Sequence, residues 1–251
     1  MSKIVLITGA TSGFGKATAA IFASNQYDVI ITGRRQERLD ELKKELEEKY
    51  GVKVHPLCFD VRDRGAAFAS INSLTHEWRA IDVLVNNAGL AAGRDHFDDA
   101  SMEDWENMLD TNVKGLLYVS KAVLPFMTER KRGHIINLGS TAAKEVYEKG
   151  NVYCASKHAV DAISQSMRID LLKHKIKVTA IHPGAAETEF SMVRFKGDKA
   201  QADKIYEGYQ PLSAEDVANV IYYTTTLPEH VCINDLVLTC LAQANSFYTY
   251  K

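Results

Sequence analysis

A short apolar run that ends in a glycine-rich segment constrains the fold of this chain more than any other feature. Residues 3–8 are mostly apolar and β-branched, Gly9, Gly13 and Gly15 follow with the spacing G-x-x-x-G-x-G, and an apolar helical pattern covers 17–24. Gly9 permits a tight turn, Gly13 lets the backbone approach a phosphate, and Gly15 lets the helix lie close to the strand. We therefore expect this loop to bind the diphosphate of a dinucleotide. Its other expected contacts are Thr11, Ser12 and Phe14.

A mononucleotide P-loop is the competing interpretation of the same segment. That motif has the form G-x-x-x-x-G-K-[ST], in which the final hydroxyl holds Mg²⁺. Gly15 and Lys16 fit it, but Ala10 stands at the first glycine and Ala17 at the hydroxyl. The sequence therefore argues against phosphate-transfer chemistry.

Short β-branched runs alternate with helical patterns along the rest of the chain. Runs at 28–32, 52–58 and 81–85 are separated by helical patterns, of which 36–49 has one apolar stripe. Strands that are apolar throughout are typical of a parallel sheet covered on both faces. No repeat or linker interrupts the pattern. We predict an α/β fold with one Rossmann-type domain over 1–251, a doubly wound parallel sheet with helices on both faces.

Composition excludes several classes of function. The 251 residues are 46% apolar and 25% charged with a net charge of −2, so we expect neither nucleic acid nor an anionic membrane as a partner. No run reaches the about 18 apolar residues of a membrane span, and the first run is too short for a signal peptide. The cysteines are scattered, so we expect reduced packing residues, a cytoplasmic protein, and no metal site, because no Cys/His cluster has ligand spacing. These cysteines are Cys58, Cys154, Cys232 and Cys240.

Two arginines follow the second predicted strand. An NAD site places an acidic residue near this point to bind the ribose hydroxyls, whereas arginine accommodates the 2′-phosphate of NADP. Arg34 and Arg35 match that phosphate in charge and can bind it bidentately. The alternative is a pair of solvated arginines at the start of a helix. We predict NADP(H) as the cofactor.

Several polar motifs follow in order: Asn86-Asn87-Ala88-Gly89, then Asn112, Ser140 and Tyr153-x-x-x-Lys157. With the glycine loop, they make the chain resemble the short-chain dehydrogenase/reductase family over essentially its whole length. The resemblance implies that Asn112, Ser140, Tyr153 and Lys157 form a catalytic tetrad. It also implies further cofactor contacts, with Lys157 on the nicotinamide ribose. These contacts are Asp60, Val61, Asn87, Ala88, Gly89, Pro183, Gly184 and Thr188.

The residue types of the tetrad fit acid–base chemistry. Tyr153 and Lys157 are four residues apart and face the same way on a helix. A phenol has a pKa of about 10, and a nearby ammonium favours the phenolate. We therefore expect Tyr153 to exchange a proton with the substrate oxygen while Ser140 binds that oxygen. Asn112 is expected to support a water relay behind Lys157.

Other segments resemble the subgroup that oxidises small 3-hydroxy acids such as serine or allo-threonine, including 32–39, 150–153, 188–191, 193–198 and 227–230. Such a substrate needs a cation for its carboxylate. Arg194 is the first candidate and Tyr147 the second contact, although Arg194 could instead be structural or lie at a subunit contact. The charged segment 142–150 and Glu187 depart from the subgroup, and we expect both to line the substrate cleft. A sulfoacetaldehyde-type or broad ketone reductase therefore remains an alternative.

A non-catalytic NADP-binding module is the rival hypothesis, but it would not need a proton donor such as Tyr153. The resemblance implies a homotetramer joined by helices at 104–127 and 151–173, although sheet packing explains the apolar face of the second equally well. We also expect His134 to lie at the surface, Cys154 to pack in the interior, and His182 not to act as a general base. The apolar face comprises Val160, Ile163, Met167 and Leu171.

Overall fold

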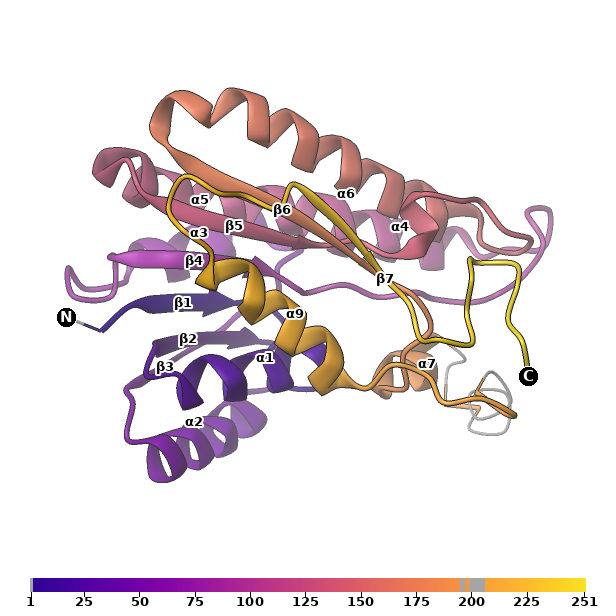
Figure 1. Cartoon of the computed structure of the whole chain (residues 1–251), viewed down its shortest axis with the longest axis horizontal. Helices are drawn as coiled ribbons and strands as arrows, with labels where there is room; N and C mark the ends of the chain where they lie inside the picture. Colours follow the sequence, from indigo (N-terminus) through magenta and orange to yellow (C-terminus); the bar gives the residue numbers. More distant parts are fainter. Residues whose placement is uncertain (1, 195–196, 199–205) are drawn as a thin grey trace.

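The computed structural model describes residues 2–194, 197–198 and 206–251 (Figure 1). Within them, seven strands form one sheet in the order β3-β2-β1-β4-β5-β6-β7, with every neighbouring pair parallel. This confirms the predicted α/β fold. The strands are β1 (Ile4–Ile7), β2 (Asp28–Gly33), β3 (Val54–Cys58), β4 (Ile81–Asn86), β5 (Gly133–Leu138), β6 (Ile176–Pro183) and β7 (Asp235–Leu238). The strand order reverses between β1 and β4, where such sheets open a crevice for ligands.

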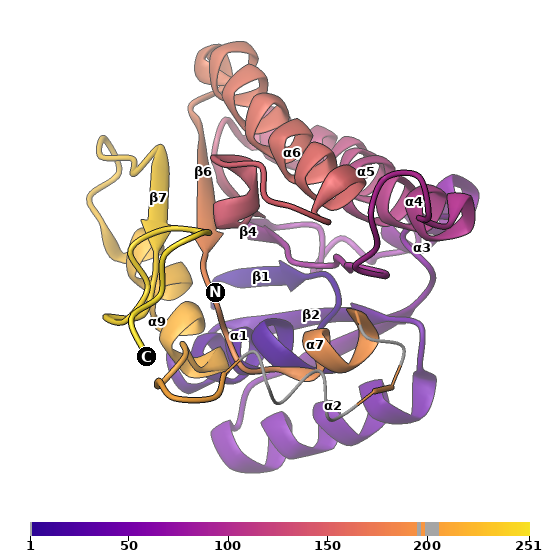
Figure 2. The same ribbon diagram turned by 90° about the vertical axis from the view of Figure 1, so that its right-hand side faces the viewer.

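Helices cover both faces of the sheet (Figure 2). On one face, α1 (Gly13–Ser24), α2 (Gln36–Tyr50) and α9 (Ala214–Thr226) enclose a core that includes Val5 and Ile7 of β1. On the other, α3 (Arg64–Asn72) and α5 (Leu116–Arg130) enclose a core that includes Leu6, and α6 (Asn151–Asp170) also packs on this side. Alternate residues of one strand thus enter two cores, which is why the strands are apolar throughout.

The sequence pattern predicted α2 correctly but missed the start of α1. In α2 the stripe Leu39, Leu42 and Leu46 is buried as expected. In contrast, α1 begins at Gly13, four residues before the apolar pattern. A Cβ at Gly15 would overlap the carbonyl oxygen of Gly9, so the glycines bring the first turn of the helix against β1. The phosphate-binding loop and the helix N-terminus are therefore one unit.

The helix expected at 104–127 is interrupted. The chain forms α4 (Met102–Leu109), a π-helical turn η1 (Asp110–Gly115), and then α5. Such π turns are frequent at functional sites, because the extra residue redirects side chains. Here Asn112 lies in the turn and is buried. The helix expected at 151–173 ends at Asp170, and a 3₁₀ turn, η3 (Leu172–His174), follows.

Two expectations about single side chains were wrong. His134 is buried in the central strand β5, where its Nε2 lies 2.7 Å from the Thr179 hydroxyl, and burial lowers its pKa to about 3. Cys58, expected to pack in the interior, is exposed at the end of β3; Cys154 and Cys240 are buried and Cys232 partly so. Among the described residues, no helix combines the length and apolar character that a membrane crossing requires.

Candidate active site

A cleft of about 1370 Å³ lies at the carboxyl ends of the central strands. All of the predicted site residues line it except Gly15 and Asn112, which lie behind its wall. The predicted residues that line it are Gly9, Thr11, Ser12, Gly13, Phe14, Arg34, Arg35, Asp60, Val61, Asn87, Ala88, Gly89, Ser140, Tyr147, Tyr153, Lys157, Pro183, Gly184, Thr188 and Arg194. Segments far apart in sequence therefore meet in one cavity, at the position that the strand order favours.

The glycine loop is joined to the end of β4 by short hydrogen bonds. The Asn87 amide donates to the carbonyl oxygens of Thr8 (2.8 Å) and Gly9 (3.1 Å), and the Thr8 hydroxyl accepts from the backbone of Asn87 and Ala88. Gly9 has φ +65°, a left-handed conformation that favours glycine. The ends of β1 and β4 thus form one rigid floor for the cleft.

Both predicted arginines lie beside this floor. Arg35 donates to the Thr11 hydroxyl at 2.9 Å, while Arg34, whose side chain is 63% exposed, lies 3.8 Å from the Asp60 carboxylate. Burial disfavours ionisation of Asp60, but hydrogen bonds from Arg62 outweigh it and lower its pKa. Asp60 is therefore already engaged by Arg62, and Arg34 keeps exposed guanidinium nitrogens beside the cleft.

Ser140, Tyr153 and Lys157 meet deeper in the cleft. The phenol of Tyr153, which is buried, forms a hydrogen bond with the Ser140 hydroxyl. Lys157 donates to the carbonyl of Leu138 at 2.9 Å, and its Nζ lies 6.0 Å from the centre of the Tyr153 ring. Tyr and Lys therefore share one face of α6, and the serine meets them from the end of β5.

The protonation of this group differs from the prediction. Burial and the neighbouring Tyr147 raise the pKa of Tyr153, and the lowering influences come from Ser140 and Arg194 rather than from Lys157. Burial also lowers the pKa of Lys157, to about 8. Burial thus favours the protonated phenol of Tyr153.

Asn112 supports the site from behind. Its amide donates to the carbonyl of Leu90 (2.8 Å) and to the hydroxyl of Ser156 (3.0 Å), and its Oδ1 accepts from Leu90 N. A Cβ at Gly89 would lie 3.2 Å from Asn112 Oδ1 and 3.5 Å from Lys157 Nζ. The π turn thus places Asn112 Oδ1 and Lys157 Nζ on the same side of Gly89. Ser156 had no sequence signal, because its partner is 44 residues away.

The substrate side of the cleft contains Arg194, at the end of α7 (Glu189–Arg194). Its guanidinium donates to the Tyr147 hydroxyl at 3.1 Å and lies 5.4 Å from the centre of the Tyr153 ring. The buried Nε has no hydrogen-bond partner among the described residues. Arg194 O accepts from Gly93 N, so the residue also has a structural contact. The side chain is oriented beside the phenol with donor capacity left for an anion.

The structure revises what we expected of the charged segments. Glu148 and Lys149 line the cleft, but Lys144 forms ion pairs elsewhere, Glu145 accepts from the backbone of Ser246, and Glu187 does not line the cleft. Of the segment 193–198, Phe195 and Lys196 lie outside the described residues. Of the charged residues in the segment 142–150 and Glu187, which we expected to line the cleft, only Glu148 and Lys149 do so.

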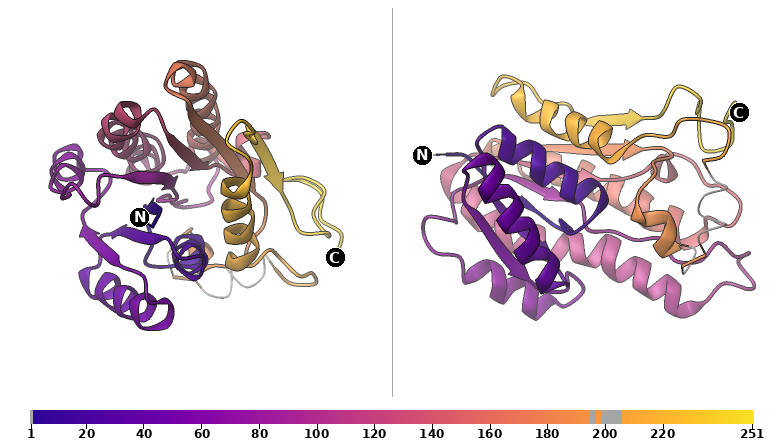
Figure 3. Two further views of the ribbon diagram at one scale, coloured as in Figure 1. Left: turned by 60° about the vertical axis from the view of Figure 1, so that its left-hand side comes forward. Right: turned by 90° about the horizontal axis from the view of Figure 1, so that it is seen from below.

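Sequence reasoning missed the C-terminal segment, which returns past β7 to the end of the sheet where α7 lies (Figure 3). The Gln243 side chain accepts from Ala185 N at 2.8 Å and packs against Gly184, fixing the loop that leads to Thr188. No local pattern marks a contact across 58 residues. Other cleft residues without a sequence signal include Arg94, Ser246, Phe247, Thr249 and Lys251.

Comparisons with known proteins agree with this geometry. The model of the family described as short chain dehydrogenase matches residues 3–199. The chain is 50% identical over 242 residues to the NADP-dependent 3-hydroxy acid dehydrogenase YdfG of Escherichia coli K12, covering 96% of each chain. It is 47% identical over 249 residues to sulfoacetaldehyde reductase 2 of Chromohalobacter salexigens, covering 99% of this chain and 98% of that one. A closed form of serine dehydrogenase complexed with NADP+ superposes with a TM-score of 0.93 at 48% identity, over 99% of each chain. The chain belongs to the short-chain dehydrogenase family.

Proposed function

We propose that this protein is an NADP(H)-dependent oxidoreductase that interconverts the hydroxyl group of a small 3-hydroxy acid and the corresponding carbonyl. The observation that carries the proposal is the meeting of Tyr153, Ser140 and Lys157 with Arg194 in one cleft. A proton donor and an anion-binding cation thus lie on either side of the same space. A non-catalytic NADP-binding module would need neither.

The cofactor end of the cleft fits a phosphorylated dinucleotide. The turn at Gly9 and the close approach of Gly15 leave the backbone at the start of α1 open to a diphosphate, and Arg34 offers charge for a 2′-phosphate. Thr188, packed 3.4 Å from a Cβ position at Gly13, would contact the nicotinamide end with Pro183 and Gly184. When bound, NADP⁺ supplies the hydride acceptor.

The chain's own residues handle the proton. In the reduction direction, the Tyr153 phenol donates its proton to the substrate oxygen, and Ser140 donates a hydrogen bond to the same oxygen. In oxidation the phenol first gives up its proton, and the phenolate then accepts the proton of the substrate hydroxyl. The Lys157 ammonium lies 6.0 Å from the centre of the Tyr153 ring, and Asn112, whose amide donates to the Leu90 carbonyl, would support a water relay behind Lys157.

The substrate class rests on Arg194. Its Nε, which has no hydrogen-bond partner among the described residues, can donate to a carboxylate while Tyr147 holds the other end of the guanidinium. YdfG acts on 3-hydroxy acids, as its name says, and supports serine, allo-threonine or 3-hydroxypropionate as the substrate type. Sulfoacetaldehyde reductase 2 supports a second candidate, because a sulfonate would bind the same cation.

A substrate panel tests the proposal. We expect kcat/KM to be highest for serine, allo-threonine or 3-hydroxypropionate, compared with isethionate and a neutral secondary alcohol. Arg194→Gln should raise KM for the anions about tenfold and leave the neutral alcohol unchanged. Arg64→Gln, on the far helix α3, is the matched control. A neutral alcohol that exceeds every anion would remove the Arg194 assignment.

We further propose a homotetramer in the cytoplasm. Val160 and Leu171 of the expected contact face are buried, and Met167 packs against the sheet core, so those residues belong to the fold. The outer face instead exposes Leu117 and Ile169, by 40% and 75%, on the two helices that would form the contact. Light scattering of the wild type and of Ile169→Glu tests the assembly.

A further inference from the structure

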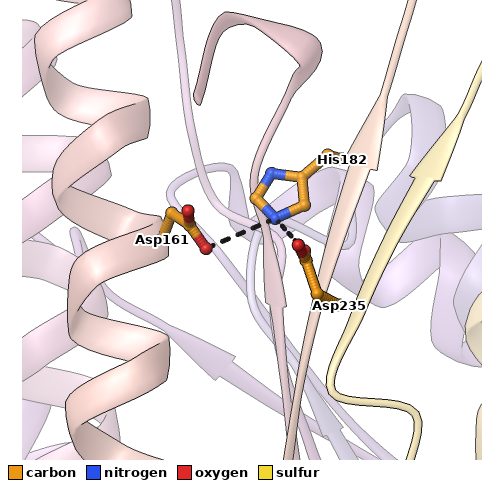
Figure 4. A group of neighbouring side chains, drawn as sticks. All are labelled: Asp161, His182 and Asp235. Atoms are coloured by element: carbon orange, nitrogen blue, oxygen red, sulfur yellow. Dashed lines mark ion pairs between the residues drawn. The ribbon is translucent and has the colours of Figure 1, made fainter. Parts of the chain in front are cut away.

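Three acceptor atoms from three elements converge beside β6, outside the cleft (Figure 4). They belong to Asp161 on α6, His182 on β6 and Asp235 at the start of β7, and all lie within 4.8 Å of one another. Nε2 of His182 is 2.7 Å from Asp235 Oδ1 and 3.7 Å from Asp161 Oδ1. None of the three residues lines the cleft.

The protonation of His182 leaves this space without a donor. The side chain is fully buried, and Nδ1 lies 3.2 Å from the carbonyl oxygen of Ser140, which can only accept, so Nδ1 carries the proton. Nε2 is then a lone pair pointing at two carboxylates, and it has no hydrogen-bond partner among the described residues. With Nδ1 as the donor to Ser140, Nε2 and the two carboxylates place three acceptors around one space, which a bound cation would satisfy.

We propose that Asp161, His182 and Asp235 bind a divalent transition-metal ion, with Zn²⁺ as the best fit to one imidazole and two carboxylates. Ligands about 2.1 Å from one ion at 90–120° lie about 3.0–3.6 Å apart. The separations of His182 Nε2 from Asp235 Oδ1 and from Asp161 Oδ1, 2.7 and 3.7 Å, bracket that range. Asp235, whose side chain is 44% exposed, can make the small adjustment and gives the ion its entry path.

The surroundings of the three ligands support the site. A metal-bound histidine commonly donates its other ring N–H to a carbonyl, as His182 does to Ser140. The outer oxygens of both carboxylates are held by Lys144, at 2.7 Å from Asp235 and 3.0 Å from Asp161, which turns the inner oxygens toward His182. Lys144 also cancels one of the two negative charges. Lys144 therefore orients the two carboxylates, while its positive charge lowers the affinity of the site for a metal ion.

The site is connected to the predicted catalytic serine. A Cβ at Gly139 would overlap the ring of His182, so the imidazole packs directly on the backbone before Ser140. An ion on Nε2 polarises the ring and strengthens the Nδ1–H bond to the Ser140 carbonyl. Bound metal would thus restrain the segment that carries the serine, without contacting substrate.

Calorimetric titration of metal-free full-length protein with Zn²⁺ tests the proposal, with thermal unfolding as a second readout. We expect one ion per chain and a Tm that rises by roughly 5–10 °C at a zinc concentration about a hundredfold above Kd. His182→Asn is the decisive variant, because its amide can still donate to the Ser140 carbonyl while the Nε2 ligand is lost. It should bind zinc at least tenfold more weakly.

Two further variants sharpen the experiment. Lys144→Gln should tighten zinc binding several-fold by removing the competing charge, whereas His96→Gln, at a surface histidine beside Glu148, should leave it unchanged. If His182→Asn does not fold, Asp235→Asn at the half-exposed ligand replaces it, with the same expected loss. Equal zinc binding by wild type and ligand variants would overturn the proposal. A Tm that responds to protonation of His182 and not to zinc would also overturn it and define an ion-pair network.

Discussion

The two halves of the cleft are built in different ways. The cofactor half consists of adjacent strand ends and backbone: Thr8, Gly9, Asn87 and Ala88 are tied by hydrogen bonds of 2.8 to 3.1 Å. The substrate half consists of side chains on α7, the loop after β5 and the C-terminal segment, which meet from distant parts of the chain. A backbone site is encoded by local motifs, whereas a side-chain site depends on which loops the fold brings together.

The largest expected effect lies at the border between the halves. Tyr153→Phe removes the proton donor and should lower kcat by about 10²–10⁴, because general acid–base catalysis contributes that much. The Kd of NADPH should stay within about twofold, since the ring remains in place. Stopped assays of NADPH consumption and fluorescence titration measure the two quantities. If Tyr153→Phe lost both turnover and affinity for NADPH, Tyr153 would also hold the cofactor, and the two halves of the cleft would not act independently.

The buried Lys157 ammonium is expected to lower the free energy of unfolding, although the proposed reaction needs this residue. Burial lowers its pKa to about 8, below the 10.5 of an exposed lysine, so charging it costs the folded state about 3 kcal/mol at pH 7. Between pH 8 and 10.5 the unfolded chain binds more protons, so this cost disappears as pH rises. Lys157→Met should therefore be inactive, and its stability relative to wild type should fall from pH 7 to pH 10. Denaturant unfolding at both pH values measures the difference; a constant gap would contradict the assignment.

Arg34→Ala should affect the cofactor half alone. Loss of a charge-assisted contact to the 2′-phosphate should raise KM for NADPH about tenfold or more and change KM for NADH little. The KM for substrate should not move, because Arg34 lies at the far end of the cleft. Steady-state kinetics with both cofactors measures this, and similar losses for NADPH and NADH would remove the phosphate contact.

The smallest effect is expected at the ion pair that joins the halves. Arg38 on α2 lies 3.3 Å from Glu189 at the start of α7, and both side chains are about half exposed. Such pairs contribute at most about 1 kcal/mol, so Arg38→Gln should change either KM less than fivefold. High salt should reduce the effect in the wild type. The exchanged pair Arg38→Glu with Glu189→Arg should recover the original KM values. If it does not, the ion pair between these two residues does not account for the effect on KM.

Much of this arrangement was readable from local pattern. The stripe Leu39, Leu42 and Leu46 and the strands apolar on both faces indicated the sheet, and the glycine spacing indicated the loop. His134 was misjudged because a polar residue after a glycine resembles a strand start, while β5 lies between two other strands and Thr179 satisfies the ring. The π turn at Asn112 was invisible, because its helical periodicity is broken by only one residue.

The sequence alone determined the parallel sheet and the dinucleotide loop, because those features depend on neighbours within a few residues, and the family resemblance supplied Tyr153 as the expected proton donor. Tertiary structure decided the rest: that burial raises the pKa of Tyr153, that Gln243 closes the loop after Gly184, and that His182 faces two carboxylates. These contacts cross 20 to 60 residues, and their free energies come from desolvation and charge in the folded interior. No spacing along the chain can record them.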